Sequence, residues 1–248
     1  MTGITAWRNG YGTTVIKNGI IQILNDNTAG NYINAVSGDF SMTGGQIIIK
    51  TKTTDKIETA QYVLNMTGGE IIVNNQGSGM VSGSGSSNSN HSFSVTNGKI
   101  SISSYGDVYG IRKQYNCAVS VTNSNISVYS RDGKAYGIFA GNNNTTVNGS
   151  TITAHSDSNT SYGIYATTAA SINSSKIEGG TYGIYADISN GGAVTLGSND
   201  DEISDSSPEI IGENYALYGN AFNFYDGVLR GTHAFQDGSI KAIPDGTT

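Results

Sequence analysis

The residues most able to do chemistry form an acidic run in the C-terminal part of the chain. Asp200, Asp201, Glu202 and Asp205 lie within a stretch of six residues. Carboxylate oxygens are preferred ligands of calcium, so this run predicts a Ca²⁺ site, and no other part of the sequence indicates a metal or cofactor. The spacing matches no calcium loop with defined ligand positions, and a solvated acidic loop is the alternative interpretation.

The same carboxylates raise the alternative of a polysaccharide-cleaving enzyme, a lyase or a glycoside hydrolase. Its centre would be Asp200 and Asp201 with a basic residue such as Arg230 one repeat later. Hydrolysis of a glycosidic bond needs two opposed carboxyl groups, and the sequence identifies no second carboxylate opposite Asp201. No G-x-S-x-G nucleophile motif is present either. We therefore expect a non-catalytic protein and keep the enzyme as the alternative.

An internal repeat indicates the strands that position these residues. A ten-residue phrase has apolar residues at positions one, three, eight and ten, and a pair of Gly, Asn or Ser residues at positions five and six. Its copies begin 24 to 29 residues apart along the whole chain. They start at Thr14, Phe40, Leu64, Phe93, Val119, Thr145, Ala170, Val194 and Phe222, and the copy at Val194 is degenerate because Asp201 occupies its position eight.

Each phrase predicts two short strands that meet at a bend. Apolar and polar residues alternate on both sides of the central pair, which is typical of strands with one buried face. Gly and Asn tolerate the positive φ that such a bend needs. A third strand per unit is predicted at segments such as Tyr136–Ala140 and Tyr162–Ala166. Residues 1–248 are thus predicted to form one all-β domain, a single-stranded parallel β-helix (β-solenoid) of about nine coils.

The repeat also predicts the core and the loops. Position three supplies one inward column and position eight another, and the polar tract 77–90 is expected to be an outward loop. The first column comprises Ile16, Met42, Met66, Val95, Val121, Val147, Ile172, Leu196 and Phe224. The second comprises Ile21, Ile47, Ile71, Ile100, Ile126, Ile152, Ile177 and Leu229.

An outward aromatic strip is the predicted ligand-binding surface. If the isoleucines of the third strands point inward, then Phe139, Tyr165 and Tyr185 point outward on consecutive coils, beside a column of glycines that includes Gly137. Such rings would stack on sugars or on a partner protein. Burial of the rings under a neighbouring loop is the alternative. Columns of Ser and Thr, such as Ser120 and Thr122, give ice binding as a minor alternative.

The net charge of the chain limits which partners we expect it to bind. Formal net charge is −6 and there is no cluster of Lys or Arg, so we expect binding neither to nucleic acid nor to an anionic membrane surface. No stretch of 18 apolar residues is present, so insertion into a bilayer is not expected. The remaining candidates are a glycan, a host or surface protein, and further copies of the chain stacked end to end at uncovered solenoid ends.

The repeat resembles the right-handed parallel β-helix proteins of the pectate-lyase-like class, and within it secreted bacterial surface proteins. The residues that carry the resemblance are Tyr162–Tyr165, Tyr182–Tyr185 and Phe222–Gly227. The resemblance implies a right-handed solenoid and an extracellular or cell-surface location in a bacterium, as a segment of a larger surface protein of adhesin or structural type. The Gly-His-Gly and Arg-Ile-Lys segments of polygalacturonases are absent.

Overall fold

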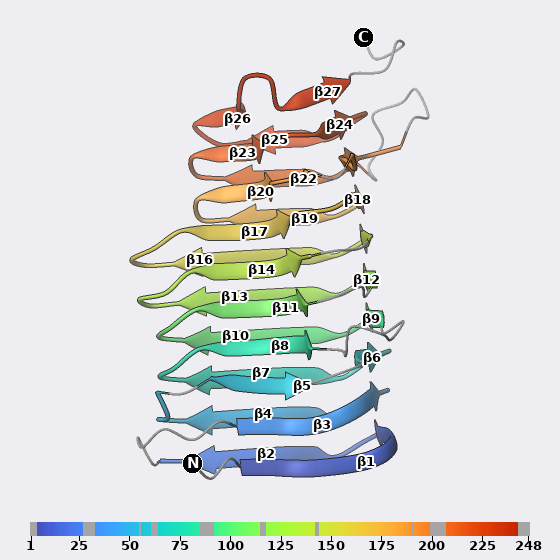
Figure 1. The fold of residues 1–248 in the computed structure, drawn as a ribbon, viewed down its shortest axis with the longest axis vertical. Helices are drawn as coiled ribbons and strands as arrows, with labels where there is room; N and C mark the ends of the chain where they lie inside the picture. Colours follow the sequence, from blue (N-terminus) through green and yellow to red (C-terminus); the bar gives the residue numbers. More distant parts are fainter. Residues whose placement is uncertain are drawn as a thin grey trace.

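The computed structural model describes residues 4–26, 33–54, 56–60, 64–84, 92–114, 118–141, 144–189, 191–198 and 207–242. These residues form strands joined by turns and contain no helix, so none that could cross a membrane is found among them. Every strand pairing is parallel, and each strand pairs with strands of the preceding and following turns rather than with its neighbours in sequence. The all-β parallel solenoid predicted from the repeat is confirmed (Figure 1).

Three ladders of strands make up the solenoid. The first is a nine-stranded sheet of β2 (Ile20–Asn25), β4 (Gln46–Thr51), β7 (Glu70–Asn75), β10 (Lys99–Ser104), β13 (Asn125–Ser130), β16 (Thr151–Ser156), β19 (Lys176–Gly179), β22 (Glu209–Gly212) and β25 (Val228–Arg230). The second, called the aromatic ladder below, contains β5 (Ile57–Ala60), β8 (Gly79–Ser84), β11 (Val108–Gln114), β14 (Ala135–Ala140), β17 (Ser161–Ala166), β20 (Tyr182–Ala186), β23 (Tyr215–Gly219) and β26 (His233–Phe235).

The third, called the hydroxyl ladder, contains β6 (Leu64–Met66), β9 (Ser92–Thr96), β12 (Ala118–Thr122), β15 (Thr145–Asn148), β18 (Ala170–Asn173), β21 (Val194–Leu196), β24 (Phe222–Phe224) and β27 (Ile240–Ala242). Two long strands, β1 (Ile4–Ile16) and β3 (Ile33–Met42), bend so that each runs through both of these ladders. The seven turns from β5 to β25 each consist of three separate strands.

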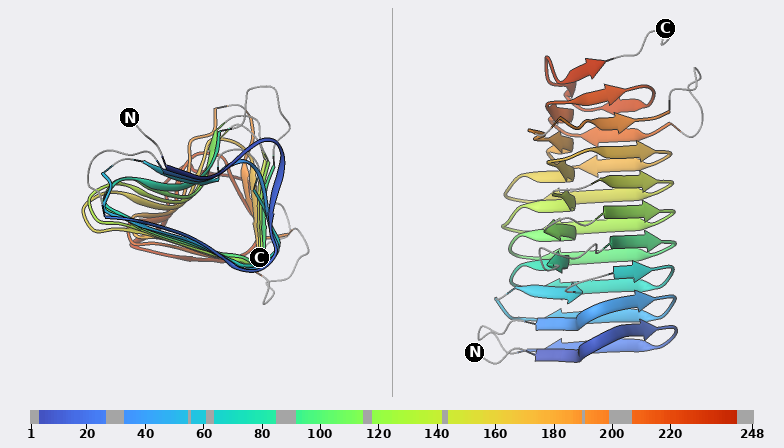
Figure 2. Two further views of the ribbon diagram at one scale, coloured as in Figure 1. Left: turned by 90° about the horizontal axis from the view of Figure 1, so that it is seen from below. Right: turned by 45° about the vertical axis from the view of Figure 1, so that its right-hand side comes forward.

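The three ladders enclose a roughly triangular cross-section, and the chain winds right-handed from the N-terminus upward (Figure 2). This is the hand expected for parallel strands joined by crossovers. Because a triangle has three flat sides, each ladder presents its own outer surface along the whole rod. A residue type repeated at one position of the phrase therefore becomes a continuous column on one side of the molecule.

The bend between the hydroxyl ladder and the nine-stranded sheet takes two forms. Early turns place the positive φ at position six of the phrase, as at Gly45 with φ 79°; the turns of β9 to β18 place it at position five, as at Asn123 with φ 47°. In the turns of β12 to β18, position six is a buried serine. The Ser124 Oγ donates to the Thr122 carbonyl at 2.7 Å and accepts the Gly98 N–H at 3.1 Å. The hydroxyl thus satisfies backbone groups that the bend leaves unpaired.

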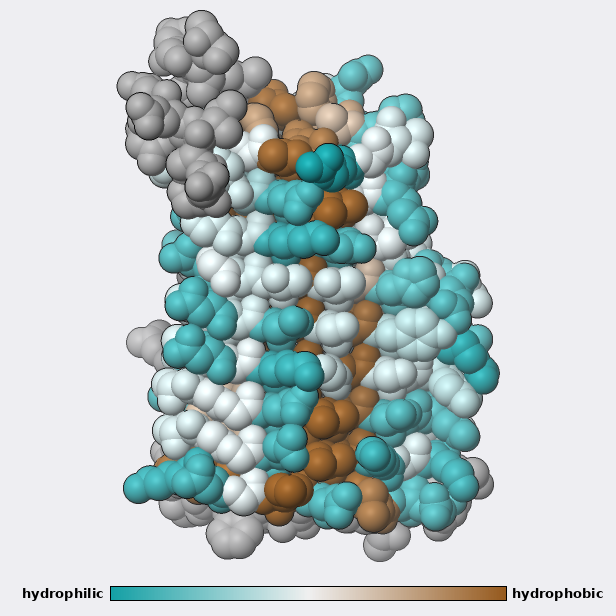
Figure 3. Space-filling view, turned by 180° about the vertical axis from the view of Figure 1, so that it is seen from behind, coloured by the Kyte–Doolittle hydropathy of each residue, from teal (hydrophilic) through white to brown (hydrophobic). Residues whose placement is uncertain are grey.

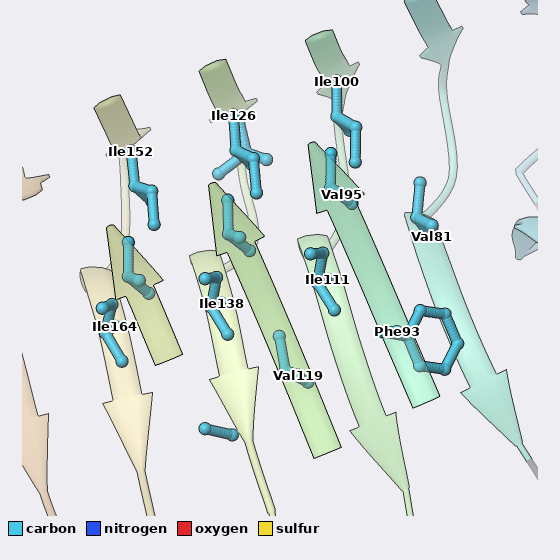
Figure 4. Packing of buried hydrophobic residues seen from close by; sticks show 14 of the residues in the cluster. Val81, Phe93, Val95, Ile100, Ile111, Val119, Ile126, Ile138, Ile152 and Ile164 are labelled. Atoms are coloured by element: carbon cyan, nitrogen blue, oxygen red, sulfur yellow. The ribbon is translucent and has the colours of Figure 1, made fainter. Parts of the chain in front are cut away.

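Both predicted core columns are confirmed. Met42, Met66 and Val95 are in register and fully buried, and Ile47, Ile71 and Ile100 likewise. Figure 4 shows how side chains from the three ladders meet inside the tube, with Val95 and Val119 from the hydroxyl ladder, Ile100, Ile126 and Ile152 from the nine-stranded sheet, and Val81, Ile111, Ile138 and Ile164 from the aromatic ladder. Stacking one apolar side chain per turn makes the core continuous.

Three details of the prediction are wrong. The structure has seven turns of three separate strands and not nine, because β1 and β3 each run through two ladders in the first two turns. In the degenerate turn the second column is occupied by Ile210 of β22, which pairs with Ile177 and Leu229, so the chain between β21 and β22 is longer than the phrase assumed. The tract 77–90 contains the strand β8 rather than only a loop. Its two apolar residues, Met80 and Val81, are buried. The strand pairs with β5 on one side and with β11 on the other, and this backbone pairing allows a segment rich in glycine and serine to form a strand.

Candidate functional site: a double aromatic column

The aromatic ladder departs from simple alternation at each Tyr-Gly-Ile segment. A Cβ added to Gly137 would lie 2.4 Å from the Ile152 Cγ2 and 2.4 Å from the Gly163 carbonyl oxygen. Ile152 belongs to the core, so Gly137 faces inward and the predicted outward glycine column is wrong. Two consecutive inward residues, Gly137 and Ile138, leave Tyr136 and Phe139 on the same outer surface, where their rings meet edge to face at 5.6 Å.

A first aromatic column is formed by the residue that precedes glycine in strands β11 to β20 and alanine in β23 and β26. It runs from Tyr109 through Tyr136, Tyr162 and Tyr182 to Tyr215 and ends at the imidazole of His233. Successive ring centroids are 4.7, 5.0, 5.5, 6.4 and 4.6 Å apart, with interplanar angles of 25° or less. The Tyr-Gly pairs in the sequence did not predict this column, because strict alternation places these tyrosines on the inner face.

A second column lies beside the first and contains the residues predicted from the sequence. Phe139, Tyr165, Tyr185 and Tyr218 follow one another at centroid distances of 5.1, 4.9 and 5.3 Å. The rings of Phe139, Tyr165 and Tyr185 stand at 70° to 88° to neighbouring rings of the first column. The Tyr218 ring is less steeply inclined, at 38° to Tyr182. Whether these residues bind a ligand stays a prediction, but they share one face with a larger set of rings than expected.

The rings bury one another. Tyr136 is 7% exposed and Tyr162 8% exposed, whereas Phe139, Tyr165 and Tyr185 are half-buried. Tyr136, Tyr162 and Tyr165 each have a stacked neighbour in the turn before and in the turn after. The surface therefore presents ring edges and phenol oxygens rather than the open flat faces expected from the sequence. Offset stacking and edge-to-face contacts are the favoured aromatic geometries, so the double column also stabilises the fold.

The Tyr136 and Tyr165 hydroxyls on this face are neutral proton donors near pH 7. Burial, helped by the nearby Asp187 carboxylate, raises the pKa of Tyr165 to about 12, and burial also raises the pKa of Tyr136. The Tyr165 hydroxyl lies 3.5 Å from the Asp187 Oδ2. At the N-terminal end of the columns, the Arg112 guanidinium lies 4.9 Å from the centre of the Tyr109 ring. The strip thus has a cation at one end and a carboxylate near its middle.

The acidic run offers no comparable site among the described residues. Asp200, Asp201, Glu202 and Asp205 fall outside them, so the calcium prediction stays untested. Arg230, the basic residue named for the enzymatic alternative, donates from Nε to the Glu209 Oε1 at 2.7 Å on the nine-stranded sheet. Within the described part of the chain, no three His, Cys, Asp or Glu side chains are grouped closely enough to hold a metal ion.

Two other surfaces could hold a polar ligand. The hydroxyl ladder aligns Ser94, Ser120 and Thr146 on consecutive turns, the regular array behind the ice-binding alternative. Near the carboxyl ends of strands β4 and β7 of the nine-stranded sheet, a hollow of about 400 Å³ is lined in part by Lys50, Asn74 and Tyr105. The outer face of that sheet, seen from behind in Figure 3, is mostly polar or neutral, and its hydrophobic residues form a narrow vertical band.

No protein-family model, curated protein or solved structure that was compared with this chain matches it. The solenoid architecture therefore rests on the repeat and on the structure itself. The resemblance to bacterial pectate-lyase-like proteins rests only on the motifs that suggested it, and activity, location and partners have to be argued from the surface of the rod.

Proposed function

We propose that this β-solenoid is a non-catalytic binding protein of adhesin or structural type that holds a glycan on the double aromatic column. The observation that carries the proposal is the repetition of the same two rings on the same face in four consecutive turns, β14 to β23. An extracellular or cell-surface location in a bacterium belongs to the proposal and is supported by the motif resemblance alone.

The size of the strip favours a linear ligand over a folded protein. The five turns from β11 to β23, at the usual strand spacing of about 4.8 Å, give a length of about 20 Å. Ring centroids of the two columns are 5.1 to 5.6 Å apart within a turn, so the strip, with the widths of the rings included, covers on the order of 200 Å². A stable protein interface buries about 800 Å² on each partner. A folded partner would need much additional surface, whereas a single glycan chain fits the strip.

The chemistry of the strip favours a ligand rich in hydroxyl groups. Ring edges carry partial positive charge and attract the oxygen atoms of a sugar. The phenol hydroxyls of Tyr165, Tyr185 and Tyr218 add donors and acceptors of hydrogen bonds. The net charge of −6 opposes nucleic acid and other polyanions on electrostatic grounds.

A glycan array probed with the intact chain, followed by calorimetry on each hit, tests the proposal. We expect binding that weakens in the double variant Tyr165→Phe, Tyr185→Phe, which removes two hydroxyls and keeps the rings. Tyr129→Phe is the matched control, because the Tyr129 hydroxyl bonds to Asp157 away from this strip. Absence of any glycan hit, or equal weakening in the control, would contradict the proposal. Release of reducing ends or unsaturated products from a bound glycan would instead identify the enzymatic alternative.

A further inference from the structure

The two aromatic columns also indicate how a bound glycan would be oriented. Resting on the proposed function, we infer that a linear, extended glycan lies parallel to the solenoid axis, with one sugar residue on each turn. Each of the four turns from β14 to β23 is then one subsite. The occupant is a chain with an extended backbone, such as a β-linked glucan, rather than a coiled or branched glycan.

The distance between successive rings of the second column supports this orientation. Rings of the second column follow one another at 5.1, 4.9 and 5.3 Å, which is the strand spacing imposed by the backbone ladder. In an extended β-1,4-linked chain, successive pyranose rings advance by about this same distance and alternate sugars turn opposite edges toward the protein, so each sugar lies beside one ring of the column. A coiled, α-linked chain curves away after the first residues and cannot follow a straight column.

A glycan contacts more rings when it lies along the solenoid axis than when it lies across the strands. A chain placed across the strands meets only the two rings of one turn, such as Tyr162 and Tyr165 at 5.4 Å. A chain placed along the axis meets the second column in four successive turns, from Phe139 to Tyr218. Because every added contact contributes to affinity, the axial direction is favoured.

The column also has a direction. Phe139, at its N-terminal end, has no hydroxyl, while Tyr165, Tyr185 and Tyr218 each have one. The Arg112 side chain occupies the position in register with Phe139 in the preceding turn. The axial arrangement therefore contains four ring subsites, of which three also supply a hydroxyl, and the fourth borders a guanidinium group.

Calorimetry with cello-oligosaccharides from dimer to hexamer tests the inference on the intact chain. Affinity is expected to rise roughly two- to tenfold with each added sugar up to the tetramer, the effect of about one net hydrogen bond per residue, and then to level off. Malto-oligosaccharides of equal length, which have the other linkage, should bind no better than the cello dimer. Tyr218→Phe should reduce trimer and tetramer affinity while leaving dimer affinity nearly unchanged, because the dimer still binds at Tyr165 and Tyr185, and Tyr129→Phe should change none of them.

Several results would overturn the axial arrangement. They are a plateau already at the dimer, equal affinity for the malto series, and array hits confined to branched glycans. Loss of binding in Lys50→Gln with full binding in Tyr218→Phe would place the glycan in the hollow beside Tyr105 instead. In the first three cases a glycan still binds to the double aromatic column and the proposed function stands, whereas binding in the hollow, or failure of every glycan on the array, would remove the proposed function itself.

Discussion

Substituting Gly137 by alanine tests the reversal of orientation on which the aromatic face depends. The added Cβ would lie 2.4 Å from the Gly163 carbonyl oxygen and 2.4 Å from the Ile152 Cγ2. The oxygen is part of the backbone, and Ile152 is fully buried in the core, so neither neighbour can move away cheaply. Overpacking of a core costs about 1–3 kcal/mol, and with close contacts on both sides we expect a loss near the upper end, about 3 kcal/mol.

Chemical denaturation followed by circular dichroism measures this loss, and thermal unfolding should show a Tm lower by about 6–12 °C for a chain of this length. Ser120→Ala, on the outer surface of the hydroxyl ladder, is the matched control and should stay within about 0.5 kcal/mol of the parent protein. If Gly137→Ala were as stable as the control, the glycines would face solvent as strict alternation predicts. The placement of both tyrosine columns on one surface would then be wrong.

Three further outcomes are expected. Ile126→Asp, which puts an unpaired charge into the core, should abolish cooperative unfolding. Ser127→Asp, one residue later and exposed, should be tolerated. Similar losses of stability in the two variants would refute the register. Burial raises the pKa of Tyr165 to about 12, whereas the pKa of tyrosine in the unfolded chain is near 10. The stabilisation of the folded state that is present below about pH 10 should therefore be lost as the pH rises from 10 toward 12. Tyrosinate absorbance that titrates fully near pH 10 would contradict this. End-to-end association through the outer strands β2 and β25 stays a prediction, and sedimentation at several concentrations with a constant monomer mass would refute it.

The sequence predicted the core because the phrase has a fixed apolar pattern. Positions three and eight alternate with polar neighbours, and in a parallel in-register solenoid equal positions must stack. Where the pattern fails, as at Asp201, the sequence alone could not show that the chain continues to Ile210 before the next strand forms. The register of that turn is determined by pairing with β19 and β25, which are contacts from distant parts of the sequence.

The aromatic face was only half predicted, for a different reason. Alternation with period two assigns Tyr136 and Phe139 to opposite faces, and only the packing of Gly137 against Ile152 places them together. A glycine that permits close approach of two ladders looks the same in the sequence as a glycine on an open surface. The recurrence of Tyr-Gly in four successive third strands was the available signal, since an inward tyrosine repeated in every turn would have overfilled the tube.

A repeated binding surface and a single catalytic centre respond differently to mutation, and this difference separates the two leading interpretations of the protein. In the double aromatic column each turn supplies an equivalent ring pair, such as Tyr162 with Tyr165 and Tyr182 with Tyr185, so removing one hydroxyl takes away one contact among several. Affinity should then decline in steps as substitutions accumulate. A cleavage site built on two opposed carboxyl groups loses its activity when either one is removed. A set of single and combined Tyr→Phe variants therefore distinguishes a graded surface from an active site even before the natural glycan is known.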